Sequence, residues 1–410
     1  MPQSTRRDFL QAGALGTAAA FGLGQTELSA AEEKPSALKI VKVETFACLH
    51  KTKLTKGVSS VLSSARDGLF IKITTDSGIV GWGETAEVGG IQGMIDHHLG
   101  KMLIGRNPLQ FRQLWRDLWG MNFGNGIAVG GIEIALQDIR GKALGVPVTD
   151  LFGGRVRDKA LAYASGLSYT EGIDPEDQFP AEAKELVGRS FKAIKMRTGR
   201  FAPRRDLKVL AAVREAVGPD IRLLTDGNGG FSFAQAVPFA KELEKLGFYF
   251  FEEPMPESIP HYVRYPELAA AIDIPLAGGE GLDSRLAAKE LIVRKTFDII
   301  QPDATLCGGI SQSLSIAEMA SLYGMITIPH CWGGAIALTA ALNVVCCIPN
   351  FNWGHSSDEP MLEFGVDENP FLTELITKPY AVKDGYVEIS KKPGLGIEIN
   401  EDVIKKYLVK

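Results

Sequence analysis

The chain has few cysteines, and none of them is arranged as in a disulfide-rich or zinc-binding protein. Its 410 residues include five cysteines, an odd number, with no Cys-x-x-Cys pair. This argues against a disulfide framework and a zinc site, so we interpret them as small buried apolar residues. Two of them, Cys307 and Cys331, fall near the ends of predicted strands, where we expect them to line the site without reacting. The five are Cys48, Cys307, Cys331, Cys346 and Cys347.

The chain also has no block of Lys and Arg, and its formal net charge is −5. This excludes the basic surface typical of nucleic-acid-binding proteins. The apolar stretch near the amino terminus, Ala12 to Leu23, is too short to cross a bilayer, so we expect no stable membrane anchor. With 45% hydrophobic and 23% charged residues, the composition is that of a globular protein with a large core.

The first 31 residues resemble an export signal. Arg6 and Arg7 precede the weakly apolar Ala12–Leu23 stretch, and small residues follow at Ser29, Ala30 and Ala31. This order predicts a twin-arginine signal over residues 1–31, cleaved after Ala31, or after Ala30 as the alternative, and export to the periplasm. The route carries folded proteins, often with a metal or cofactor already bound.

The segment after the leader predicts a small α+β domain over residues 38–155. Ile40 to Leu49 alternates β-branched and polar residues, and Gly68 to Glu84 contains two strands around a Thr-Asp-Ser-Gly turn. We therefore expect a three-stranded antiparallel sheet, with the polar stretch from Lys51 to Arg66 as a flexible loop. Residues 91–145 have apolar positions at helical spacing.

Six ionisable residues recur through the second half of the chain at intervals of 31, 26, 28, 23 and 27 residues. Each closes a short apolar run, and the intervals fit one strand, one helix and two loops. Polar residues at the carboxyl ends of successive strands predict a (β/α) barrel over residues 160–368, with its active site on that face. We expect the tail, 369–410, to return to the first domain. The six are Lys195, Asp226, Glu252, Glu280, Asp303 and His330.

Three of these residues are acids that end consecutive predicted strands: Asp226, Glu252 and Glu280. Three carboxylates at one barrel mouth repel one another unless their pKa values rise or a divalent cation lies between them. Oxygen ligands favour Mg²⁺, with Mn²⁺ next. Glu253 competes with Glu252 as the ligand, because alternate side chains of a strand face opposite ways. Asn228 is expected to contact a ligand carboxylate or the substrate.

The other strand ends supply cations and a base. Lys195 and Arg197 are two residues apart on one strand, so both face the barrel mouth. Asp303 and His330 end neighbouring strands, where a carboxylate on one imidazole nitrogen raises the basicity of the other. We therefore predict His330 as a general base. A weaker candidate is His355, which is expected to contact substrate.

Together these motifs resemble the enolase superfamily, specifically the mandelate racemase/muconate lactonizing enzyme family and its mandelate racemase subgroup. The resemblance covers almost all of the mature chain. Its motifs are K-x-R at Lys195/Arg197, D-x-N at Asp226/Asn228, E-E-P at Glu252–Pro254, G-E at Gly279/Glu280, Pro302–Ile310, P-H at Pro329/His330, L-E-F around Glu363, and Pro393–Ile399.

The resemblance implies a modified TIM-type barrel whose first domain caps the active site, together with the carboxyl-terminal segment. It implies that the three acids bind Mg²⁺, that the metal holds a substrate carboxylate, and that a base removes the α-proton to give a metal-stabilised enediolate. It assigns Glu363 to polarising the substrate carboxylate. The mobile loops of the cap would be Lys51–Arg66 and Val88–Gly93. It also implies a homo-oligomer.

One position departs from the resemblance. Mandelate racemase has a second lysine as a base where this chain has Arg197, and a guanidinium does not deprotonate in proteins. With His330 as the one clear base, the sequence favours β-elimination: a dehydratase (a hydro-lyase) that acts on an acid sugar. Lys195 would serve as a second acid or base if Arg197 lowered its pKa, so a racemase, epimerase or lactone cycloisomerase stays open. A non-catalytic exported sugar-acid binding protein is the third alternative.

Overall fold

The computed structural model describes residues 38–121, 124–256, 261–350 and 359–409. The predicted signal, residues 1–31, and the predicted substrate contact His355 lie outside this part of the chain. None of the helices in the described ranges combines the length and the hydropathy that a membrane span needs.

The first sheet is a long hairpin with one further strand on each side. β1 (Ile40–Gly57) pairs antiparallel with β2 (Leu62–Thr75), β2 pairs with β3 (Val80–Thr85), and the order is β3-β2-β1-β5. The predicted loop from Lys51 to Arg66 is wrong, because both strands continue through most of it, with Lys51 opposite Ala65. The end of β1 also pairs with β5 (Tyr169–Thr170), a segment distant in sequence, through Lys56 and Gly57, and a local polar pattern does not show such a partner.

Helices cover one face of this sheet, as the helical spacing in residues 91–145 predicted. They include η1 (Ile95–Leu99) and α4 (Gly126–Leu144), and the backbone of α4 approaches β3 closely at the glycines of that strand. A Cβ built on Gly83 would lie 1.9 Å from the carbonyl oxygen of Gly131. The others are α1 (Ile91–Met94), α2 (Gly100–Leu103), α3 (Phe111–Met121) and η2 (Val148–Phe152).

The second half of the chain forms the predicted barrel of parallel strands. Its sheet order is β11-β10-β9-β8-β7-β6-β4-β12, so the last strand returns beside the first. Within the described ranges, no ladder joins β11 to β12. The strands are β4 (Lys159–Ser165), β6 (Ala193–Arg197), β7 (Arg222–Asp226), β8 (Phe248–Glu252), β9 (Leu276–Gly278), β10 (Ile299–Ile300), β11 (Ile326–Thr327) and β12 (Met361–Gly365).

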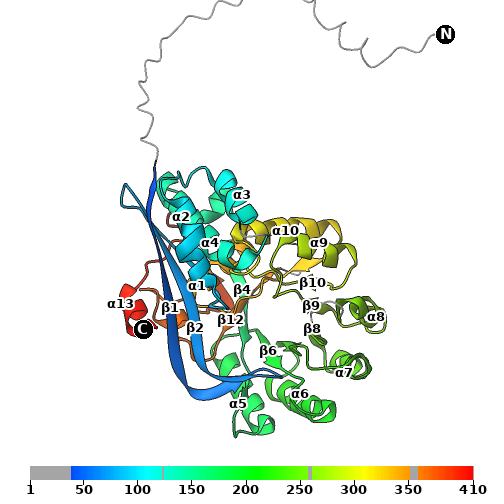
Figure 1. Cartoon of the computed structure of the whole chain (residues 1–410). Helices are drawn as coiled ribbons and strands as arrows, with labels where there is room; N and C mark the ends of the chain where they lie inside the picture. The colour runs from blue at the N-terminus through cyan, green and yellow to red at the C-terminus, as the bar shows by residue number, and fades with distance from the viewer. Residues whose placement is uncertain (1–37, 122–123, 257–260, 351–358, 410) are drawn as a thin grey trace, which may run out of the picture. The chain divides into compact units, whose positions relative to one another are not determined.

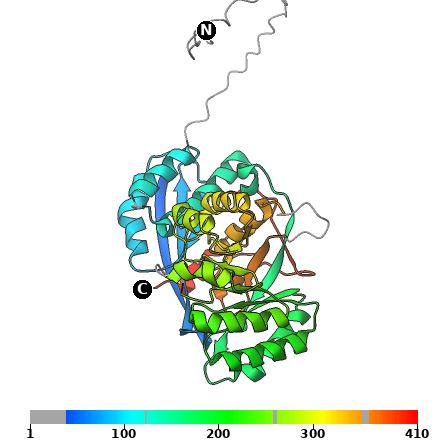
Figure 2. The ribbon, with the colours of Figure 1, turned by 90° about the vertical axis from the view of Figure 1, so that its right-hand side faces the viewer.

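Helices follow the strands and lie outside the sheet, as the green and yellow ribbons of Figure 2 show. Their apolar residues are buried in one core with those of the strands. Local sequence starts several of them: Asp174 caps α5, Pro203 is the first residue of α6, and Ser232 and Gln235 form a capping box on α7. The helices are α5 (Pro175–Gly188), α6 (Pro203–Val217), α7 (Phe233–Lys245), η3 (His261–Arg264), α8 (Tyr265–Ala269), α9 (Arg285–Val293), α10 (Ile310–Leu322) and α11 (Ala335–Cys347).

The carboxyl-terminal tail contacts both halves of the molecule. β13 (Tyr386–Glu388) pairs antiparallel with β4 of the barrel, an addition that the sequence did not predict. α12 (Pro370–Thr373) precedes it, and α13 (Glu401–Tyr407) lies against β1, as Figure 1 shows. There Leu408 bridges Cys48, and Lys72 forms a 2.7 Å ion pair with Glu401.

Candidate active site

The structure places the predicted site residues at one end of the barrel, but in two different settings. Five lie on strands: Lys195, Arg197, Asp226, Glu252 and Glu363. Three more lie in loops just beyond β9, β10 and β11, so the prediction that they are the last residues of strands was wrong. A proline has no N–H for a sheet ladder, and the proline before Asp303 and the one before His330 end the pairing early. These three are Glu280, Asp303 and His330.

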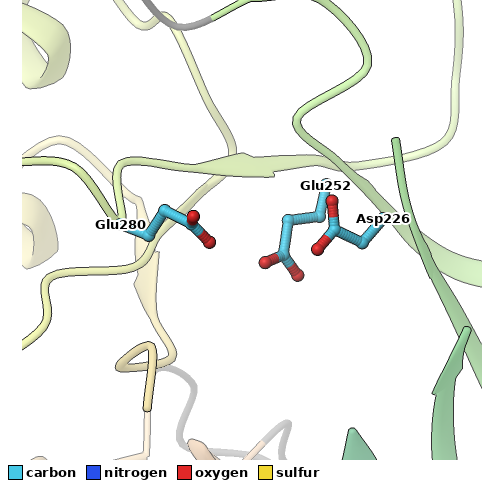
Figure 3. A group of neighbouring side chains, drawn as sticks. All are labelled: Asp226, Glu252 and Glu280. Carbon is cyan, nitrogen blue, oxygen red and sulfur yellow. The ribbon is translucent and has the colours of Figure 1, made fainter. Parts of the chain in front are cut away.

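The three acids predicted as metal ligands come together. Asp226, Glu252 and Glu280 each offer an oxygen within 4.8 Å of the others, and Figure 3 shows the carboxyl groups turned toward a common space. Glu252 is fully buried, and its Oε2 has no hydrogen-bond partner among the described residues. Burial raises its pKa to about 8, with Lys195 opposing the rise and Asp226 adding to it.

An unpartnered buried oxygen within a set of oxygen donors is what a divalent cation would satisfy, so these residues fit Mg²⁺. The choice between the two neighbouring glutamates also follows from the structure. Glu252 belongs to the group of three, whereas Glu253 has a positive φ of 39° and lies outside it.

Lys195 lies at the centre of the charge network. Its Nζ is 2.7 Å from Glu252, 2.8 Å from Glu363 and 3.7 Å from Asp226, and all four side chains are fully buried. Burial disfavours the ammonium, but the three carboxylates outweigh it and raise the pKa of Lys195 above its ordinary value. Arg197 lowers this pKa as expected, but its effect is the smaller one. Lys195 is therefore held protonated in this arrangement.

Arg197 is also occupied by an acid. Its Nη1 pairs with Oδ2 of Asp226, and Nη2 lies 3.4 Å from Oγ of Ser165. Asn228 completes this corner: its backbone N–H donates to Oδ1 of Asp226 at 2.7 Å and its side-chain amide donates to Oδ2 at 3.1 Å. Asn228 thus orients a predicted metal ligand, which is one of the two roles that the sequence allowed.

Asp303 and His330 form the predicted dyad. Nδ1 of His330 lies 2.8 Å from Oδ2 of Asp303. Since a carboxylate only accepts, Nδ1 donates the hydrogen bond, and Nε2 is the free nitrogen. Nε2 faces the acids, 3.4 Å from Oε2 of Glu280. Burial disfavours the imidazolium, but Glu280, Glu363 and Asp303 together raise the pKa of His330 to about 10, and Glu280 contributes most to the rise. A divalent cation bound by Glu280 would oppose this effect, and Nε2 of His330 would then be neutral and able to accept a proton.

Glu363 connects the two sides of the barrel mouth. Besides Lys195, it contacts the loop that carries His330, where it accepts a 3.0 Å hydrogen bond from the backbone N–H of Cys331. Burial alone would raise the pKa of Glu363, but the cationic Lys195 and His330 lower it to about 2. Cys331 itself is buried, and burial raises the pKa of its thiol well above the ordinary value, so the expectation that it does not react is consistent with the structure.

Two residues beside this site were not singled out from the sequence. Trp332 packs under two guanidinium groups, with the Cζ of Arg66 4.1 Å and the Cζ of Arg197 4.9 Å from its ring centroid. Arg66 comes from the cap strand β2, in the stretch wrongly predicted as a loop, so its approach to the barrel was hidden. The sequence offered one indication that Trp332 lies near the site, because it follows His330 by only two residues.

The chain matches two family models that together cover most of it. The model described as mandelate racemase / muconate lactonizing enzyme, N-terminal domain, matches residues 47–153. The model described as enolase C-terminal domain-like matches residues 178–403.

Named relatives cover nearly the same span. A D-galactarolactone cycloisomerase of Agrobacterium fabrum is 34% identical over 377 residues, 90% of this chain and 99% of that protein. A D-galactonate dehydratase of Pectobacterium atrosepticum is 35% identical over 82% of this chain and 90% of its own length. Among solved structures, the 3,6-anhydro-D-galactonate cycloisomerase of Zobellia galactanivorans matches with a TM-score of 0.80 and 32% identity, covering 91% of this chain and 100% of that one.

Matches across both domains, together with the geometry above, give the expected family. The chain belongs to the mandelate racemase/muconate lactonizing enzyme family of the enolase superfamily.

Proposed function

We propose that the protein is a Mg²⁺-dependent dehydratase of an acid sugar, a hydro-lyase that converts a 2,3-dihydroxy acid to a 2-keto-3-deoxy acid. The observation that carries this is the Asp303–His330 dyad, whose Nε2 faces Glu280, one of the three predicted metal ligands. The opposite cation, Arg197, is paired with an acid and cannot serve as a second base. Proton removal on one face followed by loss of a β-substituent needs only one such base.

The roles of the residues follow from their contacts. When bound by Asp226, Glu252 and Glu280, Mg²⁺ supplies positive charge that holds a substrate carboxylate and makes its α-proton more acidic. Asp303 keeps Nδ1 of His330 protonated, so Nε2 is the atom that accepts the α-proton. Lys195 and Arg197 balance the buried negative charge and hold the acids in place. Glu363, which lies between Lys195 and the loop that carries His330, would donate a hydrogen bond to the substrate carboxyl group in its protonated form as charge develops there.

A single base is enough to account for both proton transfers of the elimination. The α-carbon–hydrogen bond breaks, its proton moves to Nε2 of His330, and its electron pair delocalises into the carboxyl group to give an enediolate. As the β-carbon–oxygen bond breaks, this electron pair forms the double bond between the α- and β-carbons, and the oxygen takes the pair of the broken bond. The protonated His330 gives its proton to the departing hydroxyl, which leaves as water. The enol product becomes the 2-keto acid by tautomerisation.

A lactone cycloisomerase is the second candidate, favoured by the match to the Agrobacterium fabrum cycloisomerase over 99% of its length. It requires the same first step. If the departing β-oxygen belongs to a ring of the same substrate, elimination opens the ring, nothing is released, and the product is an isomer. The residues described above serve both outcomes, and the substrate decides between them.

Incubation with Mg²⁺ and a panel of aldonic acids, aldaric acids and their lactones tests the proposal. The dehydratase gives a 2-keto-3-deoxy acid with loss of 18 mass units per turnover, a mass set by the departing water. A cycloisomerase gives a product of unchanged mass from a lactone. A racemase or epimerase also conserves mass, but it gives a stereoisomer of the acid and no 2-keto-3-deoxy product. Tight binding with no product from any acid in the panel would favour a non-catalytic binding protein.

Export and assembly are further parts of the proposal. The twin-arginine leader over residues 1–31 supports a periplasmic location, and the resemblance to the family supports a homo-oligomer. Fractionation of cells that express the wild type and an Arg6→Lys, Arg7→Lys variant tests the first, with periplasmic protein expected only for the wild type. Sedimentation of the purified protein tests the second.

A further inference from the structure

The base of the proposed reaction lies on two loops, and the strands that precede these loops are short. β10 and β11 have two residues each, whereas β6, β7 and β8 have five. Asp303 and His330 both lie beyond the last residue of these short strands. Contacts from elsewhere must therefore fix their positions.

One set of contacts reaches Asp303 from the cap strand β3. The buried Thr85 has its Oγ1 2.7 Å from the carbonyl of Ile127 and 3.0 Å from the carbonyl of Thr305, and one hydroxyl proton is shared between them. Thr305 in turn donates to Oδ1 of Asp303 with both its backbone N–H and its Oγ1, each at 2.7 Å. The other oxygen of Asp303 is the one on His330.

The neighbouring cap residue reaches the loop after His330. The carboxylate of Glu84 is buried and accepts hydrogen bonds from the backbone N–H groups of Gly334 and Ala337, at the start of α11. These are donors that a helix leaves unsatisfied, and a negative charge is favourable beside them. Gly334 follows His330 by four residues, so Glu84 fixes the end of the segment that carries the imidazole.

The helix α4 of the first domain also contacts the loop after Asp303, and here backbone lies against backbone. A Cβ built on Gly130 would lie 2.4 Å from the carbonyl oxygen of Thr305 and 2.8 Å from that of Ala304. Helix backbone and loop backbone therefore touch directly, two residues beyond Asp303. The acids Asp226 and Glu252, in contrast, accept hydrogen bonds from residues of the barrel: Lys195, Arg197 and Asn228.

We propose that Thr85 and Glu84 are positioning residues for the Asp303–His330 base, so that the first domain holds the catalytic dyad in register with the metal site as well as covering it. This inference rests on the proposed role of His330 as the base. It assigns to two consecutive residues of β3 an effect on the chemical step, although neither touches the substrate.

Thr85→Val tests the proposal most directly, because valine keeps the shape and removes the hydroxyl. We expect kcat to fall about 10-fold with KM changed less than about twofold, since a small misplacement of a base lowers the rate of the chemical step. Thr85→Ser restores the hydroxyl and should return kcat to within about twofold of wild type. Thr45→Val is the matched control, because Thr45 bonds Asp96 within the cap, and it should leave kcat unchanged.

A second readout does not depend on turnover. In protein labelled with ¹⁵N-histidine, the downfield Nδ1–H resonance that His330→Asn removes reports the hydrogen bond to Asp303. It should shift in Thr85→Val and stay in place in Thr85→Ser and Thr45→Val. Glu84→Gln, which keeps one acceptor oxygen, should move the same resonance and provides a second variant if Thr85→Val does not fold. Mg²⁺ affinity, measured by calorimetry, should be unchanged throughout.

The outcomes separate the two proposals. If the resonance shifts in Thr85→Val but the wild type turns over no acid sugar, the positioning role is supported and the proposed function is overturned. A resonance and a kcat that are unchanged in both Thr85→Val and Glu84→Gln would overturn the positioning role whatever the reaction is. Equal losses in Thr85→Val and Thr85→Ser would also overturn it, because the hydroxyl would then have no part in the effect.

Discussion

The two sides of the barrel mouth are built in different ways. On one side, Lys195, Asp226 and Glu252 lie on strands of five residues, are fully buried, and neutralise one another at distances of 2.7 to 3.7 Å. On the other side, Asp303 and His330 lie in loops beyond strands of two residues. Contacts with the first domain fix those loops.

This difference suggests that one side binds the cation and the other transfers the proton. The strand side is a rigid electrostatic cage suited to a cation, because strands packed on both faces hold a side chain in one place. The loop side carries the group that must accept and return a proton. The position of this group depends on contacts with the first domain. Substitutions in that domain should therefore affect proton transfer and leave metal binding unchanged. The following predictions test this division.

The largest effect is expected for His330→Asn on the loop side. Asparagine has no basic nitrogen, so exchange of the substrate α-proton in deuterated water should fall by about 10³-fold or more. Mg²⁺ binding, measured by calorimetry, should stay within error of wild type. Exchange that persists undiminished would show that another group is the base.

Next in size is Glu252→Gln on the strand side. It removes one of three charged oxygen donors, and Mg²⁺ affinity should fall about 100-fold, with activity at low Mg²⁺ falling in parallel. Glu253→Gln is the control, because the neighbouring residue lies outside the group of three, and its Mg²⁺ affinity should match wild type. A normal affinity in Glu252→Gln would place the cation elsewhere.

Lys195→Met should lower stability rather than only activity. It leaves three buried acids without their common cation, which should reduce the free energy of unfolding by about 3 kcal/mol without metal. Added Mg²⁺ should recover part of this loss. Urea unfolding with and without Mg²⁺ measures it, and Lys208→Met, which removes an exposed pair with Glu176, is the control expected to show no change. A loss that Mg²⁺ does not reduce would contradict the shared role of cation and lysine.

The smallest effect concerns the cap contact and depends on pH. Burial raises the pKa of Glu84 from an ordinary 4.5 to about 7, so the folded protein holds this proton more tightly than the unfolded chain. The resulting stabilisation is full below pH 4.5 and is lost as the pH rises toward 7. Relative to Glu84→Gln, wild type should therefore lose at least about 1 kcal/mol of unfolding free energy over this range, since one pKa unit is about 1.4 kcal/mol. Equal pH profiles for the two proteins would contradict the shift.

The sequence predicted the strand side better than the loop side. A carboxylate that closes an apolar run is a local signal, and Asp226 and Glu252 lie where that signal put them. Asp303 and His330 were paired correctly, but the sequence did not show that prolines displace them from their strands. It gave no sign of the cap residues Thr85, Glu84 and Arg66 near this site, because those contacts join segments more than 100 residues apart. Local patterns do not encode such long-range contacts.

Crystals grown with Mn²⁺ and a sugar acid test the central claim most directly, because the anomalous signal locates the cation and the density locates the substrate. The account predicts Mn²⁺ bound by oxygens of Asp226, Glu252 and Glu280, with the α-carbon about 3.5 Å from Nε2 of His330. A cation bound elsewhere, or an α-carbon that faces Lys195 with His330 turned away, would contradict it.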